Sequence, residues 1–202
     1  MFTYQDLLSA ITDPSGREVL DPATGEVVGS VHESTTAELD DAVAAARAAQ
    51  PEWARLGHEK RSEYLHKAAD AVEGNAEALA ELLSREQGKP VKNGPNAAFE
   101  VGGCSAWLRA SADFPLEPEV LVDDESGYAE MEYLPLGVVG AIGPWNWPMM
   151  ITVWQVAASL RMGNTVVVKP SEYTPLSVLG LVHVLNQTLP EDVLRVVPGG
   201  GE

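Results

Sequence analysis

The stretch that decides the fold is GVVGAIGPWNWPMMITVWQVAASLRMGNTVVVKPSEYTP, residues 137–175. An apolar run at 138–142 and a β-branched run at 165–168 are typical of strands that are buried on both faces. Between them, residues 149–162 carry apolar side chains at helical spacing, and a Gly-Asn pair then ends the helix. Buried strands joined by a helix predict a parallel α/β sheet, because parallel strands need such a crossover.

Polar residues follow each of these strands. Trp145 and Asn146 come after the first strand, and the run 169–172, Lys-Pro-Ser-Glu, comes after the second. Ligands of open parallel sheets bind at the carboxyl ends of the strands, so we expect both clusters to face a ligand. Thr174 and Pro175 then predict the cap and the first residue of another helix.

The order of these clusters resembles the aldehyde dehydrogenase superfamily. The resemblance rests on a composite motif, PWNWP at 144–148 followed by GNTVVVKPSEYTP at 163–175, and it runs from about Asp21 to the end of the chain. Further segments agree with it in the same order: DPATGEVVGSV at 21–31, LSREQGKP at 83–90 and the acid-rich segment 117–133. The resemblance implies NAD(P)-dependent oxidation of an aldehyde to a carboxylic acid.

In that family the nucleophilic cysteine and the general-base glutamate lie far downstream of the Lys-Pro-Ser-Glu motif. The resemblance therefore implies an N-terminal, cofactor-domain portion that lacks both groups and stops within a strand-to-helix loop at 197–202. We expect this portion alone to be inactive. Two other interpretations stay open: a non-catalytic nucleotide-binding or oligomerisation remnant, and a decayed gene product.

The expected fold is α/β, with an N-terminal helical block, the first strands of a Rossmann-like parallel sheet and a protruding β-hairpin. A capping box at Thr35 and Glu38 opens a helix that runs to about Gln50. An arm with short strands is expected at 1–31, and further helices at 59–73, 76–87 and 95–112. The expected division is an arm and the helical part of the cofactor domain at 1–116, an oligomerisation-type hairpin at 117–135, and an incomplete NAD(P)-binding sheet at 136–202, without a catalytic domain.

Asn146 is the candidate catalytic residue. A neutral amide that donates a hydrogen bond stabilises charge developing on a carbonyl oxygen, and in the resembled family the asparagine of this motif holds the oxyanion. The other interpretation is an asparagine that completes the turn after a strand. The long motif around it favours the oxyanion role.

Cofactor binding is assigned by the resemblance to Lys169 and Glu172, which contact the adenosine ribose in the family. An acidic residue beside a ribose favours NAD, although NADP remains possible because the lysine offsets that charge. A surface ion pair between the two side chains is the alternative. The same groove is expected to be lined by Ile142, Gly143, Pro144, Trp145 and Ser171.

Trp147 and Trp154 are candidates for the substrate tunnel by resemblance, whereas packing in the core is the alternative for large apolar residues on a helix. An aromatic tunnel would suit an apolar or aromatic aldehyde. Cys104 is the single thiol of the chain, but no basic residue lies near it in a predicted helix interior. We therefore interpret Cys104 as a small packed residue rather than a nucleophile.

Composition excludes several classes of protein. The net charge of −17, from 30 acidic and 13 basic residues, argues against a nucleic-acid partner, because phosphate binding requires a basic surface. No apolar run is long enough to span a membrane, and the four histidines lack metal-ligand spacing, so neither a membrane partner nor a metal is expected. A single cysteine fits a reducing, cytoplasmic compartment. The expected partners are an aldehyde substrate and, by resemblance, further copies of the chain or a complementary half.

Overall fold

The computed structural model describes residues 1–94 and 96–201, and within them seven helices and seven strands form an α/β fold. The strands make three small sheets: β1 (Arg17–Leu20) with β2 (Val27–Val31), β3 (Glu119–Asp124) with β4 (Gly127–Met131), and β5 (Val138–Ile142) with β6 (Thr165–Lys169) and β7 (Leu194–Val196). The helices are α1 (Tyr4–Ile11), α2 (Thr36–Arg55), α3 (Gly57–Gly74), α4 (Ala76–Gln87), α5 (Ala97–Asp113), α6 (Pro148–Arg161) and α7 (Pro175–Leu185). The expected fold class is confirmed.

The third sheet contains the strands predicted from residues 137–175. Its order is β5-β6-β7, and all its pairs are parallel. Val167 packs against Ala42 and Ala46 of α2, whereas its neighbours Val166 and Val168 belong to the main core. The central strand is therefore covered on both faces, which explains why its residues are uniformly apolar or β-branched.

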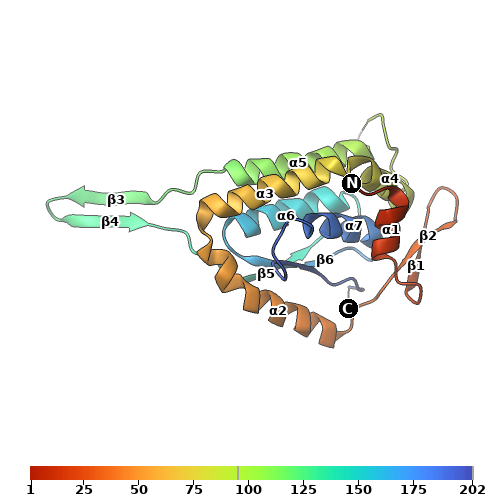
Figure 1. Cartoon of the computed structure of the whole chain (residues 1–202), viewed down its shortest axis with the longest axis horizontal. Helices are drawn as coiled ribbons and strands as arrows, with labels where there is room; N and C mark the ends of the chain where they lie inside the picture. The colour runs from red at the N-terminus through yellow and green to blue at the C-terminus, as the bar shows by residue number, and fades with distance from the viewer. Residues whose placement is uncertain (95, 202) are drawn as a thin grey trace.

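Helices cover this sheet in layers (Figure 1). Helix α2 lies against one face, and α6 and α7 lie against the other. Helices α3, α4 and α5 pack on α6 and α7 and complete the core on that side. The sheet thus has one thinly covered face, under α2 alone, and one deeply buried face.

The hairpin β3–β4 projects away from this body (Figure 1). All of its strand residues are exposed, including apolar side chains such as Leu121 and Tyr128. Asp124 accepts a hydrogen bond from the Ser126 amide in the turn, at 2.7 Å. The hairpin predicted from the polar turn between apolar residues is confirmed, while the proposed division into domains stays a prediction.

Helix α1 was not expected, because residues 1–31 were predicted to be an arm with short strands only. Thr3 caps the helix and forms a capping box with Asp6, and Leu7 is completely buried. The local signal was present in the sequence as a Thr-x-x-Asp pattern. The short strands expected in the same segment are confirmed as β1 and β2.

Helix α2 continues through Pro51 to Arg55, beyond the expected end near Gln50. Trp53 explains the extension, because its side chain is buried and its Nε1 donates to the Leu160 carbonyl at 3.1 Å. This long-range contact keeps the last turn helical. The helix expected at 95–112 is α5, which begins after the Asn96 cap; Pro95 lies outside the described residues.

Candidate functional site

The two polar clusters lie at the same edge of the parallel sheet. Ile142, the last residue of β5, pairs with Lys169, the last residue of β6, and the Gly143 amide donates to the Lys169 carbonyl at 3.0 Å. A Cβ on Gly143 would lie 2.5 Å from the Thr152 hydroxyl oxygen. Glycine is required here because α6 approaches the strand end so closely.

Asn146 is exposed in the loop between β5 and α6, and its neighbour Trp145 is 58% exposed. The Asn146 backbone carbonyl accepts hydrogen bonds from Gln87 Nε2 at 2.8 Å and from Lys89 Nζ at 3.1 Å. Gln87 Nε2 also donates to the Trp145 carbonyl at 2.9 Å. The Asn146 side-chain amide makes no hydrogen bond to the residues that the structure describes, so it is available to an external acceptor.

Helix α6 begins beside this loop without a cap of its own. Trp147 is the N-cap residue and has no side-chain hydrogen bond to the helix. The Glu100 carboxylate replaces such a cap, because its Oε1 accepts from the amides of Met149 at 2.9 Å and Met150 at 3.2 Å. Its Oε2 accepts from Lys89 Nζ at 2.5 Å, and the two side chains are 0% and 10% exposed, respectively.

Helix α7 begins in the same way. Thr174 is the N-cap residue, as expected, but it does not cap the helix, and its buried Oγ1 has no hydrogen-bond partner within the described part of the chain. The buried Glu86 carboxylate instead accepts from the amides of Leu176 at 2.5 Å and Ser177 at 2.9 Å. Burial raises the pKa of Glu86 to about 7, although these amide hydrogen bonds oppose the shift.

These carboxylates occupy positions that attract anions. Helix N-termini at the carboxyl ends of parallel strands commonly bind phosphate, because their amides are unpaired and the helix dipole favours negative charge. Here Glu100 and Glu86 already accept those hydrogen bonds from α6 and α7. These amides are therefore not free to bind a phosphate.

Lys169 and Glu172 remain close to each other, with Lys169 Nζ 3.9 Å from a carboxylate oxygen of Glu172. Their side chains are 26% and 40% exposed, so this weak ion pair leaves both accessible. Arg17 Nη2, from β1, donates to the Glu172 backbone carbonyl at 2.7 Å and holds the loop. Ser171 is buried and accepts from the Tyr173 amide at 3.3 Å, which indicates a role within the loop.

A groove of about 520 Å³ runs along the thinly covered face of the sheet, between α2 and the strand ends. Ile142 and Lys169 line it, together with the glycine run 199–201. A Cβ built on Gly200 or Gly201 would meet nothing within 4 Å, so the backbone there is open to a ligand. Its size is within the range of cofactor pockets, roughly 300–1,000 Å³, and the partly exposed Lys169 supplies polar contacts beside it.

The tryptophans predicted for a tunnel are not part of the core. Trp147 is partly buried against Phe99, with ring centroids 6.0 Å apart, and Lys89 Nζ lies 3.9 Å from the Trp147 ring centroid. Trp154 is 40% exposed and packs on Trp107 at 5.3 Å. Neither tryptophan is fully buried, and α5 and α6 present two separate aromatic pairs, Phe99–Trp147 and Trp107–Trp154; the tunnel role stays a prediction.

Cys104 is completely buried in α5. Burial, together with the nearby Glu100 carboxylate, raises the pKa of this thiol well above its usual value. A neutral, inaccessible thiol is a poor nucleophile. The interpretation of Cys104 as a packed residue is confirmed.

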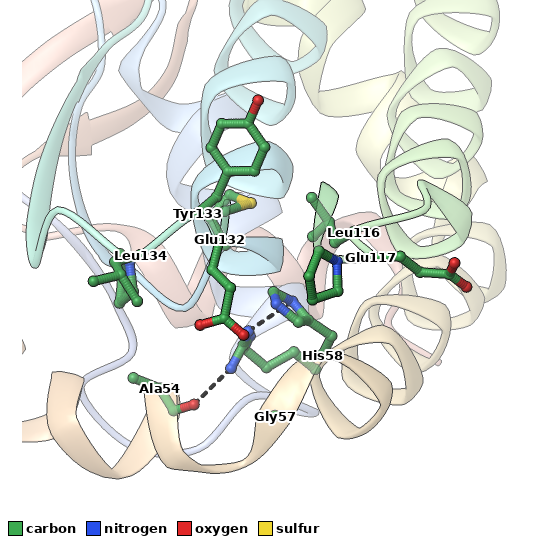
Figure 2. Close-up of a pocket in the computed structure, with 12 residues that line it drawn as sticks. Ala54, Gly57, His58, Leu116, Glu117, Glu132, Tyr133 and Leu134 are labelled. Atoms are coloured by element: carbon green, nitrogen blue, oxygen red, sulfur yellow. Dashed lines mark hydrogen bonds between the residues drawn. The ribbon is translucent and has the colours of Figure 1, made fainter. Parts of the chain in front are cut away.

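A separate cavity of about 240 Å³ lies where the hairpin stem meets the junction of α2 and α3. Figure 2 shows Glu132 reaching from the stem toward the start of α3, where His58 lies. His58 Nδ1 lies 2.9 Å from Arg61 Nη2, and desolvation with the charges of Arg61 and Arg161 lowers the pKa of His58. Residues of the hairpin stem and of α2 and α3 line this cavity, which shares no lining residue with the groove at the strand ends.

Residues 1–94 and 96–201 contain no group of three or more His, Cys, Asp or Glu side chains placed to hold a metal ion. No helix among them has the length and hydropathy to cross a membrane.

The model of the aldehyde dehydrogenase family matches residues 11–202. The chain belongs to the aldehyde dehydrogenase family. The family expected from the composite motif is therefore confirmed.

Curated members of the family are similar over nearly the whole chain. A betaine aldehyde dehydrogenase of Rhizobium leguminosarum bv. trifolii (strain WSM2304) is 36% identical over 197 residues, which cover 93% of this chain and 39% of the relative. Aldehyde dehydrogenase LUC3 of Fusarium sp. is 36% identical over 181 residues, covering 90% and 37%. The chain thus spans about two fifths of the length of these relatives.

Solved structures are similar to this chain in fold as well as in sequence. Crystal structures of PnpE from Pseudomonas sp. WBC-3, one of them in complex with nicotinamide adenine dinucleotide, match this fold with a TM-score of 0.85 and 36% identity. The match covers 91% of this chain and 38% of the PnpE chain. The arrangement of helices and parallel strands described above therefore matches about two fifths of the PnpE chain.

Sequence reasoning missed the residues that support the two loops. Gln87, Lys89, Glu86, Glu100 and Arg17 all contact loop backbone or helix N-termini from distant parts of the chain. The segment LSREQGKP had been noted only as a family resemblance. The one sequence feature that could have indicated this role is that the segment places several polar residues at a helix end, directly after leucines.

Proposed function

We propose that residues 1–202 provide the cofactor groove and the oxyanion donor for NAD(P)-dependent oxidation of an aldehyde to a carboxylic acid. The observation that carries this proposal is the register of β5 and β6, which brings the Asn146 loop and the Lys169–Glu172 pair to one edge of the sheet. The NAD complex of PnpE, a similar structure, supports the choice of cofactor.

In this proposal the bound cofactor supplies the hydride acceptor. Lys169 donates to, and Glu172 accepts from, the ribose hydroxyls at the mouth of the groove, and Ile142, Gly143, Pro144 and Trp145 line the same edge. Because α6 and α7 already have carboxylate caps, the open glycine run 199–201 is the part of the groove left for phosphate.

The Asn146 amide donates a hydrogen bond to the aldehyde oxygen as a nucleophile adds to the carbonyl carbon and negative charge develops on that oxygen. Cys104 cannot be this nucleophile, because it is buried and its pKa is raised. In this proposal the attacking thiolate therefore comes from outside residues 1–202. The aromatic surface of Trp147 and Trp154 borders the substrate and favours an apolar or aromatic aldehyde.

Two measurements on purified chain 1–202 test this function. Equilibrium dialysis should detect weak binding of NAD, in the millimolar range, and Glu172→Gln should weaken NAD more than NADP because the carboxylate accepts from ribose hydroxyls and repels a 2′-phosphate. The matched control Glu26→Gln, in the exposed β1–β2 turn, should change neither. An unchanged NAD affinity in Glu172→Gln would assign Glu172 to the surface ion pair only.

The second measurement concerns activity. Aldehydes and NAD added to chain 1–202 should yield no NADH, because its single thiol is buried. Turnover that disappears in Cys104→Ser would contradict the assignment of the nucleophile to other residues. An alternative role in association with other chains is favoured by the exposed hairpin β3–β4, and it would survive loss of NAD binding.

A further inference from the structure

One short segment at the end of α4 contacts both ligand-facing loops. Residues 86–89, Glu-Gln-Gly-Lys, connect α4 to the chain that leads into α5. Glu86 contacts the first turn of α7, directly after the loop at 169–174, whereas Gln87 and Lys89 contact the loop at 143–147. The two loops are therefore joined through a single turn of backbone as well as through the sheet.

The contact to the first loop consists of charged and neutral donors. Gln87 Nε2 donates to the carbonyls of Trp145 and Asn146, and Lys89 Nζ donates to the Asn146 carbonyl. Gln87 makes these contacts although its Oε1 is buried without a donor among the described residues.

The contact to the second loop is the Glu86 carboxylate at the first turn of α7. Its two oxygens accept separately from Leu176 and Ser177, so the helix start is fixed in both position and orientation. Pro175 precedes these amides and has no N–H to offer. Glu86 therefore sets where the loop carrying Lys169 and Glu172 ends.

The turn that carries these side chains is itself fixed. Gly88 has a φ of +77°, and a Cβ there would lie 2.8 Å from Pro22 Cγ. The Gly88 amide donates to the Ser84 carbonyl at 2.9 Å, and Ser84 Oγ donates to the Lys89 carbonyl at 2.6 Å. The left-handed turn at Gly88 lets Glu86 and Lys89, three residues apart, point toward different parts of the sheet edge.

We propose that residues 86–89 are positioning residues that set the spacing between the oxyanion donor and the ribose-binding pair: Gln87 and Lys89 hold the Asn146 loop, and Glu86 holds the loop of Lys169 and Glu172. This inference rests on the proposed function for the identity of the two loops. In this proposal the Glu-Gln-Gly-Lys segment touches neither substrate nor cofactor and acts only through the two loops that it holds.

Hydrogen–deuterium exchange of the full chain, read by mass spectrometry, tests whether Gln87 and Glu86 hold different loops. Gln87→Leu keeps the Lys89–Glu100 pair and removes the unpaired Oε1, and Glu86→Gln places an amide N–H₂ opposite one of the two backbone amides. Glu81→Gln is the matched control, because Glu81 is on the same helix and pairs only with Arg85 among the residues described. Glu86→Asp is a second variant that keeps the charge but shortens the reach.

Each variant should affect one loop. Gln87→Leu should speed exchange in 143–150 about tenfold, the effect of losing roughly one net hydrogen bond, and leave 170–178 unchanged. Glu86→Gln and Glu86→Asp should speed exchange in 170–178 and leave 143–150 unchanged. The melting midpoint of Gln87→Leu should stay that of the unaltered chain, which separates local release of the loop from general loss of structure.

The proposal is wrong if both loops, or neither, respond to each variant. NAD dialysis gives an independent functional readout: Glu86→Gln should weaken NAD binding more than Gln87→Leu does, because Lys169 and Glu172 are on the loop that Glu86 holds. Absence of NAD binding by the unaltered chain would count against the proposed function, whereas the exchange pattern would still decide whether residues 86–89 position the loops.

Discussion

Replacing Lys89 by methionine should be among the most damaging single substitutions away from the apolar core. The change removes the ammonium that neutralises Glu100, whose carboxylate is completely buried between α5 and α6. Removing one partner of a buried ion pair costs about 3–5 kcal/mol, because the remaining charge stays desolvated. Loss of the cation–π contact with Trp147, 3.9 Å from ammonium to ring centroid, adds to this.

For a chain of this size we expect a fall in the melting midpoint of about 6–20 °C, at about 2–4 °C for each kcal/mol. Urea unfolding followed by tryptophan fluorescence measures the free energy directly. Lys60→Met is the matched control, because Lys60 pairs with Glu63 on the surface of α3 and both side chains are about half exposed. Its midpoint should equal that of the unaltered chain.

The double variant Lys89→Met with Glu100→Gln removes the stranded charge and should recover part of the lost stability, since a neutral amide can still accept from Met149 and Met150. The reasoning fails if Lys89→Met is as stable as the Lys60→Met control. It also fails if the double variant is no more stable than Lys89→Met, because the cost would then not come from an unpaired carboxylate.

Three further outcomes follow from the same structure. The pKa of Glu86 is raised to about 7 from 4.5, so between these values the folded state binds more protons than the unfolded state. Stability should therefore fall by about 3 kcal/mol as pH rises from 4.5 to 7 and level off above 7, and Glu86→Gln should flatten this dependence in urea midpoints from pH 5 to 8. Gly88→Ala should cost about 1–2 kcal/mol, because its φ is +77° and the new Cβ would meet Pro22; an unchanged midpoint would contradict the fixed turn. Replacing 119–131 by a short Gly-Ser linker should reduce self-association in light scattering, since the hairpin exposes apolar side chains, and an oligomer that persists would move the contact to another surface.

Glu86 and Glu100 each accept hydrogen bonds from the first amides of a helix, which is why substitutions at or beside them should cost more stability than ordinary surface changes. Helices α6 and α7 both start with a residue that does not cap, followed by proline, and both receive a glutamate from the outer helical layer. The helix ends that carry the ligand-facing loops thus depend on α4 and α5. Stability of the outer layer and geometry of the site are coupled through Glu86 and Glu100.

Much of this protein was determined by local pattern in the sequence. The β-branched run at 165–168 could only be a strand covered on both faces, and the apolar spacing in 149–162 could only be a helix packed on it. The polar residues after each strand necessarily meet at one edge, because parallel strands bring their carboxyl ends together. The composite motif around Asn146 and Lys169 was long enough to identify the family.

Tertiary structure alone decided what supports those loops. Glu86 and Glu100 occupy helical positions that look like ordinary solvated charges, and the amides they cap lie about 90 and 50 residues further along the chain. Trp53 extends α2 past Pro51 for the same reason, through a carbonyl 107 residues away. Periodicity and capping rules describe neighbours within a few residues, whereas these contacts exist only once α4 and α5 have packed against α6 and α7.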